Sequence, residues 1–272
     1  MTTVRPAGAW ETGLLADDER ALLAEELRLV MSAASADAYP PVAQLLDVDV
    51  CRDWLNEVRV RIDAPSLPAA ASLFAKRWSF LITGAPLYAM SVFDKGLRVG
   101  LDEVGLDADY ADRLWVSRLR LRDADVTLAP LGLARDDWRL DVTTRLFAGH
   151  VAPLWRALSV AGGVAERILW ENLAVRAYSL YEGRLDEVAP DALARAQADF
   201  DWLRRDAPPG VFGLDHNPLK RYDFAPTPVP GRAQPVRFRK TCCLYYQVPH
   251  AREYCRACPL IKPGRKPPVV FD

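Results

Sequence analysis

Residues 68–90 read PAAASLFAKRWSFLITGAPLYAM, an almost uninterrupted apolar stretch. A segment of this length and composition predicts a helix buried at the centre of the protein. Pro68 suits the first turn of such a helix, and Gly84 or Pro86 predicts a bend. The uncharged part, residues 78–93, is shorter than the roughly 20 residues that cross a bilayer. We therefore expect a core helix and no integral membrane span.

Helical spacing of apolar residues recurs on both sides of this central stretch. It predicts further helices over about residues 17–34, from about Cys51 up to the central stretch, over 146–162, over 164–183 and over 190–205. Gly162 and Gly163 separate two of these helices, which predicts an antiparallel pair.

Between Leu97 and Leu131 the apolar residues alternate with other residues. This period of two predicts a small antiparallel sheet. Seven prolines then fall between residues 208 and 235, which predicts a long coil. The fold class expected from these patterns is α+β: a mainly helical single domain at 1–207 with a small sheet near 97–131, a Pro-rich coil at 208–236 and a C-terminal segment at 237–272.

Charge is unevenly distributed along the chain. The net charge of the whole chain is -1, yet residues 217–272 hold eleven lysines and arginines against three acidic residues. The total gives no general attraction to nucleic acid or membranes. The first ten residues contain no apolar run after their charge, so they do not resemble a secretory signal, and we expect a cytoplasmic protein.

Four of the five cysteines lie in the basic segment, in RKTCCLYY (239–246) and YCRACPL (254–260). The pattern is C-C-x11-C-x2-C. A reducing cytosol disfavours a disulfide scaffold and favours metal binding or redox chemistry. Neighbouring arginines and lysines would lower the thiol pKa values and favour bound metal over bound protons.

Spacing alone leaves three interpretations of these cysteines. Structural zinc is common, but zinc sites usually use two C-x2-4-C turns instead of an adjacent pair. Adjacent cysteines point apart in an extended chain, which suits the two irons of a [2Fe-2S] cluster. A redox-active disulfide is the third interpretation.

The C-terminal text resembles that of FhuF-type ferric-siderophore reductases, whose C-C-x10-C-x2-C motif binds a [2Fe-2S] cluster. A looser resemblance extends upstream through ILWEN (168–172). This chain has eleven residues between the cysteine pairs instead of ten, an insertion that a loop accommodates easily. Carried over by position, the resemblance implies that the cluster ligands, and hence the metal ligands, are Cys242, Cys243, Cys255 and Cys258.

The resemblance further implies an oxidoreductase that passes one electron to siderophore-bound Fe(III), with hydroxamate siderophores as the family-level expectation. The helical domain would hold the ferric complex. No glycine-rich nucleotide motif follows a predicted strand, so electrons must come from an external donor such as a ferredoxin or a reductase. The basic segment could dock an acidic donor or attract anionic ferric complexes.

Two rival functions remain at this point. One is a non-catalytic, zinc-stapled interaction module that binds nucleic acid or an acidic partner; the reductase interpretation predicts no nucleic-acid partner. The other is a siderophore carrier or biosynthesis accessory, which would leave the four cysteines without a purpose.

The remaining candidate residues have ordinary explanations. Cys51 fits a small core residue. His150 fits a helix, His216 a turn and His250 the cysteine loop, where it could donate a hydrogen bond to a sulfur. The catalytic residues are not assigned from the sequence. Trp170, Asn172 and Arg176 share a helical neighbourhood, in which Arg176 could meet an anion, although a structural role is the simpler interpretation.

Overall fold

The computed structural model describes residues 10–32, 39–107, 109–111 and 114–268. It is mainly helical with small sheets, which confirms the predicted α+β class. The α-helices are α1 (Asp17–Leu27), α3 (Val48–Arg61), α4 (Leu67–Phe93), α5 (Ala134–Leu146), α6 (Ala152–Gly162), α7 (Glu166–Gly183) and α8 (Pro190–Asp201). Within these described ranges, none of the helices combines the length and apolar character needed to span a membrane.

Helix α4 is the predicted central helix. The Ser66 side chain caps its first turn by accepting a hydrogen bond from the Ala69 N–H (3.4 Å), and the helix is buried along most of its length. It runs without interruption through Gly84 and Pro86, where the sequence predicts a bend. Gly84 serves close packing instead, because a Cβ atom there would lie only 3.3 Å from Cδ2 of Leu27 in α1.

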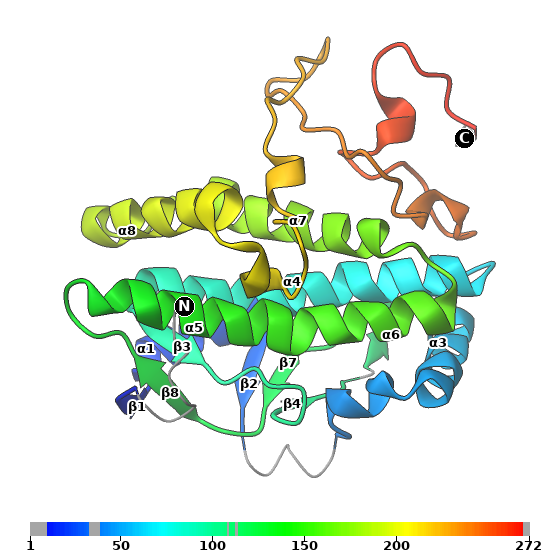
Figure 1. Ribbon diagram of the computed structural model, residues 1–272. Helices are drawn as coiled ribbons and strands as arrows, with labels where there is room; N and C mark the ends of the chain where they lie inside the picture. Colours follow the sequence, from blue (N-terminus) through cyan, green and yellow to red (C-terminus); the bar gives the residue numbers. More distant parts are fainter. Residues whose placement is uncertain (1–9, 33–38, 108, 112–113, 269–272) are drawn as a thin grey trace.

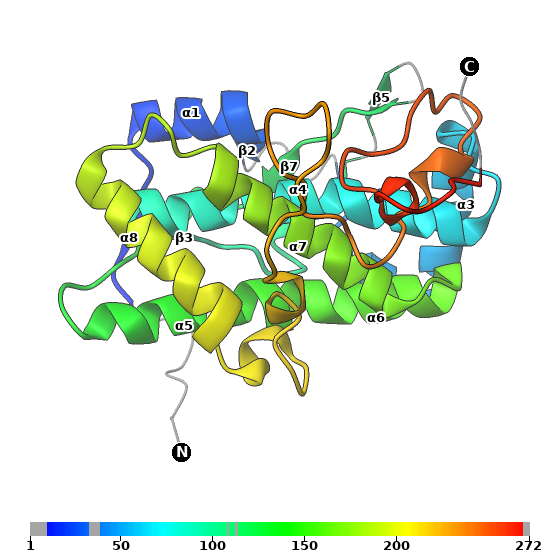
Figure 2. The ribbon, with the colours of Figure 1, turned by 90° about the horizontal axis from the view of Figure 1, so that it is seen from above.

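The other elements surround α4 in layers (Figures 1 and 2). Helices α7 and α8 lie over one side of it, and α7 packs along α4. Helix α5, the π-helical turn η2 (Phe147–Val151) and α6 form one continuous rod beside α4. This rod begins at Ala134, earlier than the predicted start at residue 146. Helices α6 and α7 pack together across the predicted glycine break, with Gly163 in the left-handed region at φ 64°.

Short strands cover the side of α4 that faces away from α7 (Figure 1). The strands are β1 (Thr12–Leu14), β2 (Leu29–Met31), β3 (Lys95–Leu97), β4 (Val104–Gly105), β5 (Tyr110–Ala111), β6 (Leu114–Trp115), β7 (Leu119–Leu121) and β8 (Asp125–Leu128). They form sheets of order β1-β8-β3, β2-β7-β4 and β5-β6. The single antiparallel sheet expected near 97–131 is thus several small sheets, and β2 pairs with β7 in parallel.

The predicted helix over 17–34 is wrong in its second half. Arg28 adopts a left-handed conformation (φ 60°) and ends α1, and Leu29–Met31 form β2. Residues 33–34 lie outside the described residues. The apolar residues Leu29, Val30 and Met31 suit a strand as well as a helix, and pairing with the distant β7 decides between them.

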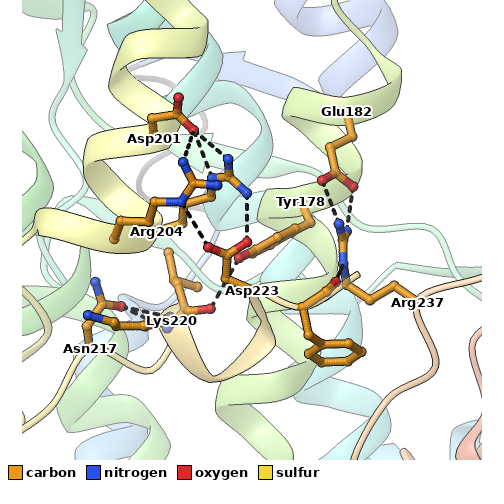
Figure 3. Close-up of polar contacts among 11 residues, drawn as sticks. Tyr178, Glu182, Asp201, Arg204, Asn217, Lys220, Asp223 and Arg237 are labelled. Atoms are coloured by element: carbon orange, nitrogen blue, oxygen red, sulfur yellow. Dashed lines mark hydrogen bonds and ion pairs between the residues drawn. The ribbon is translucent and has the colours of Figure 1, made fainter. Parts of the chain in front are cut away.

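The Pro-rich segment after α8 contains the short helices η4 (Pro209–Phe212) and η5 (Lys220–Tyr222) and an isolated bridge between Thr227 and Val236. Ion pairs attach it to the helical layer (Figure 3). Asp223 accepts from Arg204 Nη1 at 2.7 Å, and Arg237 donates to both carboxylate oxygens of Glu182 at 2.6 and 3.0 Å. These contacts hold the segment against the helical layer, and the chain then continues across α7 to the cysteines.

Candidate metal centre

The C-terminal segment that carries four of the cysteines lies over α4 and α7, in orange to red in Figures 1 and 2. Their thiols form a chain of contacts. Cys242 is hydrogen-bonded to Cys258, Cys258 to Cys255, and Cys255 to Cys243, whose sulfur lies 3.9 Å away. Cys243 and Cys258 are buried, whereas Cys242 and Cys255 are partly exposed. Cys51 lies elsewhere, fully buried in α3, as expected for a core residue.

Local turns point the cysteines toward one another. After the adjacent pair, Leu244 adopts a left-handed conformation (φ 63°), and its N–H points at the Cys242 sulfur at 3.4 Å. The 3₁₀ turn η6 (Tyr245–Gln247) follows. In the second pair the Cys258 N–H donates to the Cys255 carbonyl at 2.9 Å, and η7 (Pro259–Ile261) begins directly afterwards. These turns fold both halves of the motif back on themselves.

Helix α7 holds the backbone that precedes the adjacent pair. The buried Glu171 carboxylate accepts hydrogen bonds from the N–H groups of Lys240 (2.5 Å) and Thr241 (2.6 Å) and from the Thr241 hydroxyl. One carboxylate therefore satisfies two consecutive backbone donors next to Cys242. Charged hydrogen bonds of this kind are about twice as strong as neutral ones.

A second attachment reaches Cys243 itself from α4 and α7 together. The Ser72 hydroxyl of α4 donates to the Cys243 carbonyl at 2.9 Å. Asn172 of α7 donates to the Ser72 carbonyl at 2.9 Å, which ties the two helices at this point. Both side chains are fully buried or nearly so. The adjacent cysteines are thus fixed to the helical body on either side.

Positive charge gathers around the sulfurs. Lys76 Nζ lies 3.7 Å from the Cys243 sulfur, and Arg176 and Arg239 also act electrostatically on these thiols. Arg239 is 4% exposed, and its Nε and Nη2 atoms are without hydrogen-bond partners within the described residues. Burial and the charge of Arg239 lower the pKa of Arg176. A buried guanidinium without a partner is costly, so this site is suited to an anion.

Each thiol responds to its neighbours. The hydrogen bond with Cys258 lowers the pKa of Cys242, helped by the Leu244 N–H. The hydrogen bond to Cys255 raises the pKa of Cys243, and burial adds to this, while Lys76 and Arg239 oppose it. Bound metal would remove the competing protons and leave the cations facing thiolates.

Four thiolates are a donor set that suits a [2Fe-2S] cluster. In the part of the chain that the structure describes, no group of three or more histidine, cysteine, aspartate or glutamate side chains is placed to hold one metal ion. The sulfurs instead form a continuous row in the order Cys242, Cys258, Cys255 and Cys243. A [2Fe-2S] cluster held by four thiolates is negatively charged, which suits the surrounding cations.

Comparison with known families agrees with this geometry. Residues 72–226 match the family described as "Ferric iron reductase FhuF-like transporter", and residues 239–260 match the "FhuF 2Fe-2S C-terminal domain". The chain belongs to the FhuF-like family. The second match contains all four cysteines and supports the [2Fe-2S] cofactor over zinc. No curated protein matches the chain in a direct search.

The histidines have different surroundings from one another. His150 is buried in η2, where it accepts from Trp78 Nε1 (3.1 Å) and contacts the Val99 carbonyl through Nδ1 (2.7 Å). Because Nε2 accepts, Nδ1 carries the proton, and burial lowers the pKa of His150 to about 4. His216 is exposed and pairs with the neighbouring Asp215. None of these contacts involves a sulfur of the site.

Sequence reasoning did not find the residues that support the cysteines. Lys76 carried a signal, because it is one of two charged residues inside the apolar central stretch. Glu171 and Asn172 belong to the ILWEN segment that carried the family resemblance, but no role was predicted for Glu171 and only a structural one for Asn172. Ser72 had no distinguishing signal, since its partner lies 171 residues away.

Proposed function

We propose that the protein is a cytoplasmic ferric-siderophore reductase, in which one electron passes from a [2Fe-2S] cluster on Cys242, Cys243, Cys255 and Cys258 to siderophore-bound Fe(III). One observation carries this proposal: the four thiols lie together among several cations. Within the described residues, no carboxylate neutralises these cations near the sulfurs. The family description, a ferric iron reductase, supports it.

Reduction explains how iron would leave the siderophore. Siderophore oxygens are hard ligands that suit Fe(III), and Fe(II) binds them much less tightly. One electron therefore releases the metal, and no bond of the siderophore breaks. The cluster, when bound, supplies the one-electron chemistry, while the protein supplies position and electrostatics.

The residues of the chain perform the remaining tasks. Glu171 and Ser72 hold the backbone of the adjacent cysteines, so the sulfurs keep their positions when the charge changes. Lys76 and Arg239 offset the negative charge that one-electron reduction adds. The partly exposed Cys242 and Cys255 offer an edge through which electrons can enter or leave.

The electron donor in this proposal is a separate one-electron carrier such as a ferredoxin. The excess of lysines and arginines in 217–272 supports docking of an acidic protein surface. Such docking predicts that the rate of reduction by ferredoxin falls as ionic strength rises. An unchanged rate from low to high salt would contradict it.

Anaerobic purification and a single-turnover assay test the function. We expect reddish-brown absorption that bleaches with dithionite and about two irons and two sulfides per chain. The reduced protein should then reoxidise on mixing with a ferric siderophore and yield one Fe(II), trapped by a ferrous chelator, per electron stored.

Two serine variants make the ligand assignment specific. Cys243→Ser should lose the cluster while far-ultraviolet circular dichroism shows the helices intact, and Cys51→Ser should keep both cluster and turnover. Full cluster occupancy in Cys243→Ser would refute the ligand set. A colourless wild-type protein that contains zinc and no sulfide would favour the interaction module instead.

A further inference from the structure

A second feature lies next to the cysteines, on the side of Cys243. A pocket of about 330 Å³ opens between α3, α4, α7 and the cysteine segment. Apolar side chains of α3 and α4, among them Val58 and Leu73, form part of its wall. Its volume is at the lower end for small-molecule sites, so it would admit part of a ferric complex and not a whole siderophore.

The polar lining of this pocket is positive. Arg28, Lys76, Arg77 and Arg176 contribute to it, and none of the described lining residues is an aspartate or glutamate. The Nε atoms of Arg77 and Arg176 and the Nδ1 atom of His250, which also lines the pocket, are buried and without hydrogen-bond partners in the described part of the chain. Four cations and three unused ring or guanidinium nitrogens therefore surround one space.

Backbone carbonyls position two of the arginines but leave their charge uncompensated. Arg28 donates to the Val116 carbonyl at 3.1 Å, and Arg77 donates to the Ser117 carbonyl at 3.0 Å. Asp107, the carboxylate that acts on Arg77, is already paired with Arg120 at 2.7 Å. Burial lowers the pKa of Arg77 to about 10, and the charges of Arg28 and Arg176 add to the shift, so Arg77 is still protonated at neutral pH.

The pocket and the cysteine site share a wall. Lys76 lines the pocket, and its Nζ lies 3.7 Å from the Cys243 sulfur and 4.9 Å from the ring centroid of Tyr245. Tyr245 also lines the pocket and begins η6, two residues after Cys243. A ligand in this pocket is thus one side chain away from a sulfur of the site.

We propose that this pocket receives the iron end of the substrate, and that it selects ferric complexes of net negative charge, such as those with carboxylate or catecholate oxygens, over neutral trihydroxamate complexes. The inference rests on the proposed function and narrows its substrate class. One electron converts the bound Fe(III) to Fe(II), no bond forms or breaks within the ligand, and the external one-electron donor restores the electron. The complex becomes more negative by one charge, so the same cations also stabilise the product.

Binding can be separated from reduction with gallium(III), which matches Fe(III) in charge but does not accept the electron. We would titrate the cluster-loaded protein with gallium citrate and with neutral gallium ferrichrome, following tryptophan fluorescence and calorimetry. Gallium citrate should bind at least about tenfold more tightly. Arg77→Gln and Arg28→Gln should each weaken that binding about tenfold or more, whereas Arg77→Lys, which keeps the charge, should retain most of it.

Arg145→Gln provides the matched control, because Arg145 is an arginine of α5 outside this pocket and pairs with Asp141. Its gallium citrate affinity should equal that of the wild type. Tighter binding of gallium ferrichrome, equal binding of both probes, or unchanged affinity in both glutamine variants would overturn the inference. Reoxidation of the reduced protein by the corresponding ferric complexes is measured separately. If neither complex accepts an electron, the proposed function is wrong, whatever the binding result.

Discussion

Glu171→Gln should loosen the cysteine site while leaving the helical body folded. The carboxylate accepts three hydrogen bonds from Lys240 and Thr241. Hydrogen bonds to a charged group contribute about 1.5–3 kcal/mol each when removed. A glutamine keeps one acceptor oxygen but turns an NH₂ group toward the remaining donors. We therefore expect the attachment of this segment to lose about 2–4 kcal/mol of free energy, which is less than the sum over all three hydrogen bonds.

The assay is the rate of iron release to a strong chelator, measured from the visible absorption under anaerobic conditions. If release requires the segment before Cys242 to open, a loss of 2–4 kcal/mol raises the open population, and hence the rate, roughly 30- to 700-fold. The urea midpoint of the helical body should change little.

Glu182→Gln is the matched control, because it makes the same substitution in the same helix. The Glu182 carboxylate pairs with Arg237 and takes no part in the contacts that hold the cysteines. Its release rate should stay within a few-fold of the wild type, since partly exposed pairs contribute up to about 1 kcal/mol. Equal release rates for the two variants would refute the role given to Glu171.

Three further predictions concern single side chains. Lys76→Gln should make the reduction potential more negative by roughly 50 mV, about 1 kcal/mol for one electron, in a spectroelectrochemical titration; an unchanged potential would mean that Lys76 does not sense the cluster charge. Burial lowers the pKa of His150 to about 4, so below pH 6.5 the unfolded state binds more protons than the folded state. The free energy of unfolding in urea should therefore fall by up to about 1.4 kcal/mol for each pH unit as the pH drops from 6.5 to 4. His150→Gln should remove this slope. Burial raises the pKa of Cys51 to about 11, so iodoacetamide at pH 8 should leave it unmodified in the native protein and modify it in urea; rapid native labelling, read by mass spectrometry, would show that α3 opens readily.

The central helix and the cysteine cluster could be predicted because their signals are local. Residues 68–90 are apolar enough to require burial, and C-C-x11-C-x2-C carries its chemistry in its spacing. The strands near 97–131 could be predicted from the alternation of their apolar residues, but the parallel pairing of β2 with β7 could not. These two strands are about ninety residues apart, and nothing in the sequence near Leu29 indicates that partner. Helix α5 was missed because nearly half of its residues are charged, although Trp138, Val142 and Leu146 already repeat at helical spacing.

The support of the site is the least predictable part of the molecule. Glu171 and Ser72 act on backbone groups of residues that lie about 70 and 171 positions away. Such contacts depend on the packing of α4 against α7 and leave no pattern in the local sequence. The cations around the pocket are similarly hard to predict, since Arg28 directly follows α1 and Arg176 lies in α7, so they come together only in the folded chain.

The order of elements along the chain has a consequence for how the protein acquires its metal. Helices α4 and α7, which provide Ser72 and Glu171, precede all four C-terminal cysteines in the sequence. A chain growing from its N-terminus would complete this platform before the first of those thiols emerges from the ribosome. Formation of the cysteine site would then require only that the short C-terminal segment fold onto Ser72 and Glu171 of a helical body that is already complete.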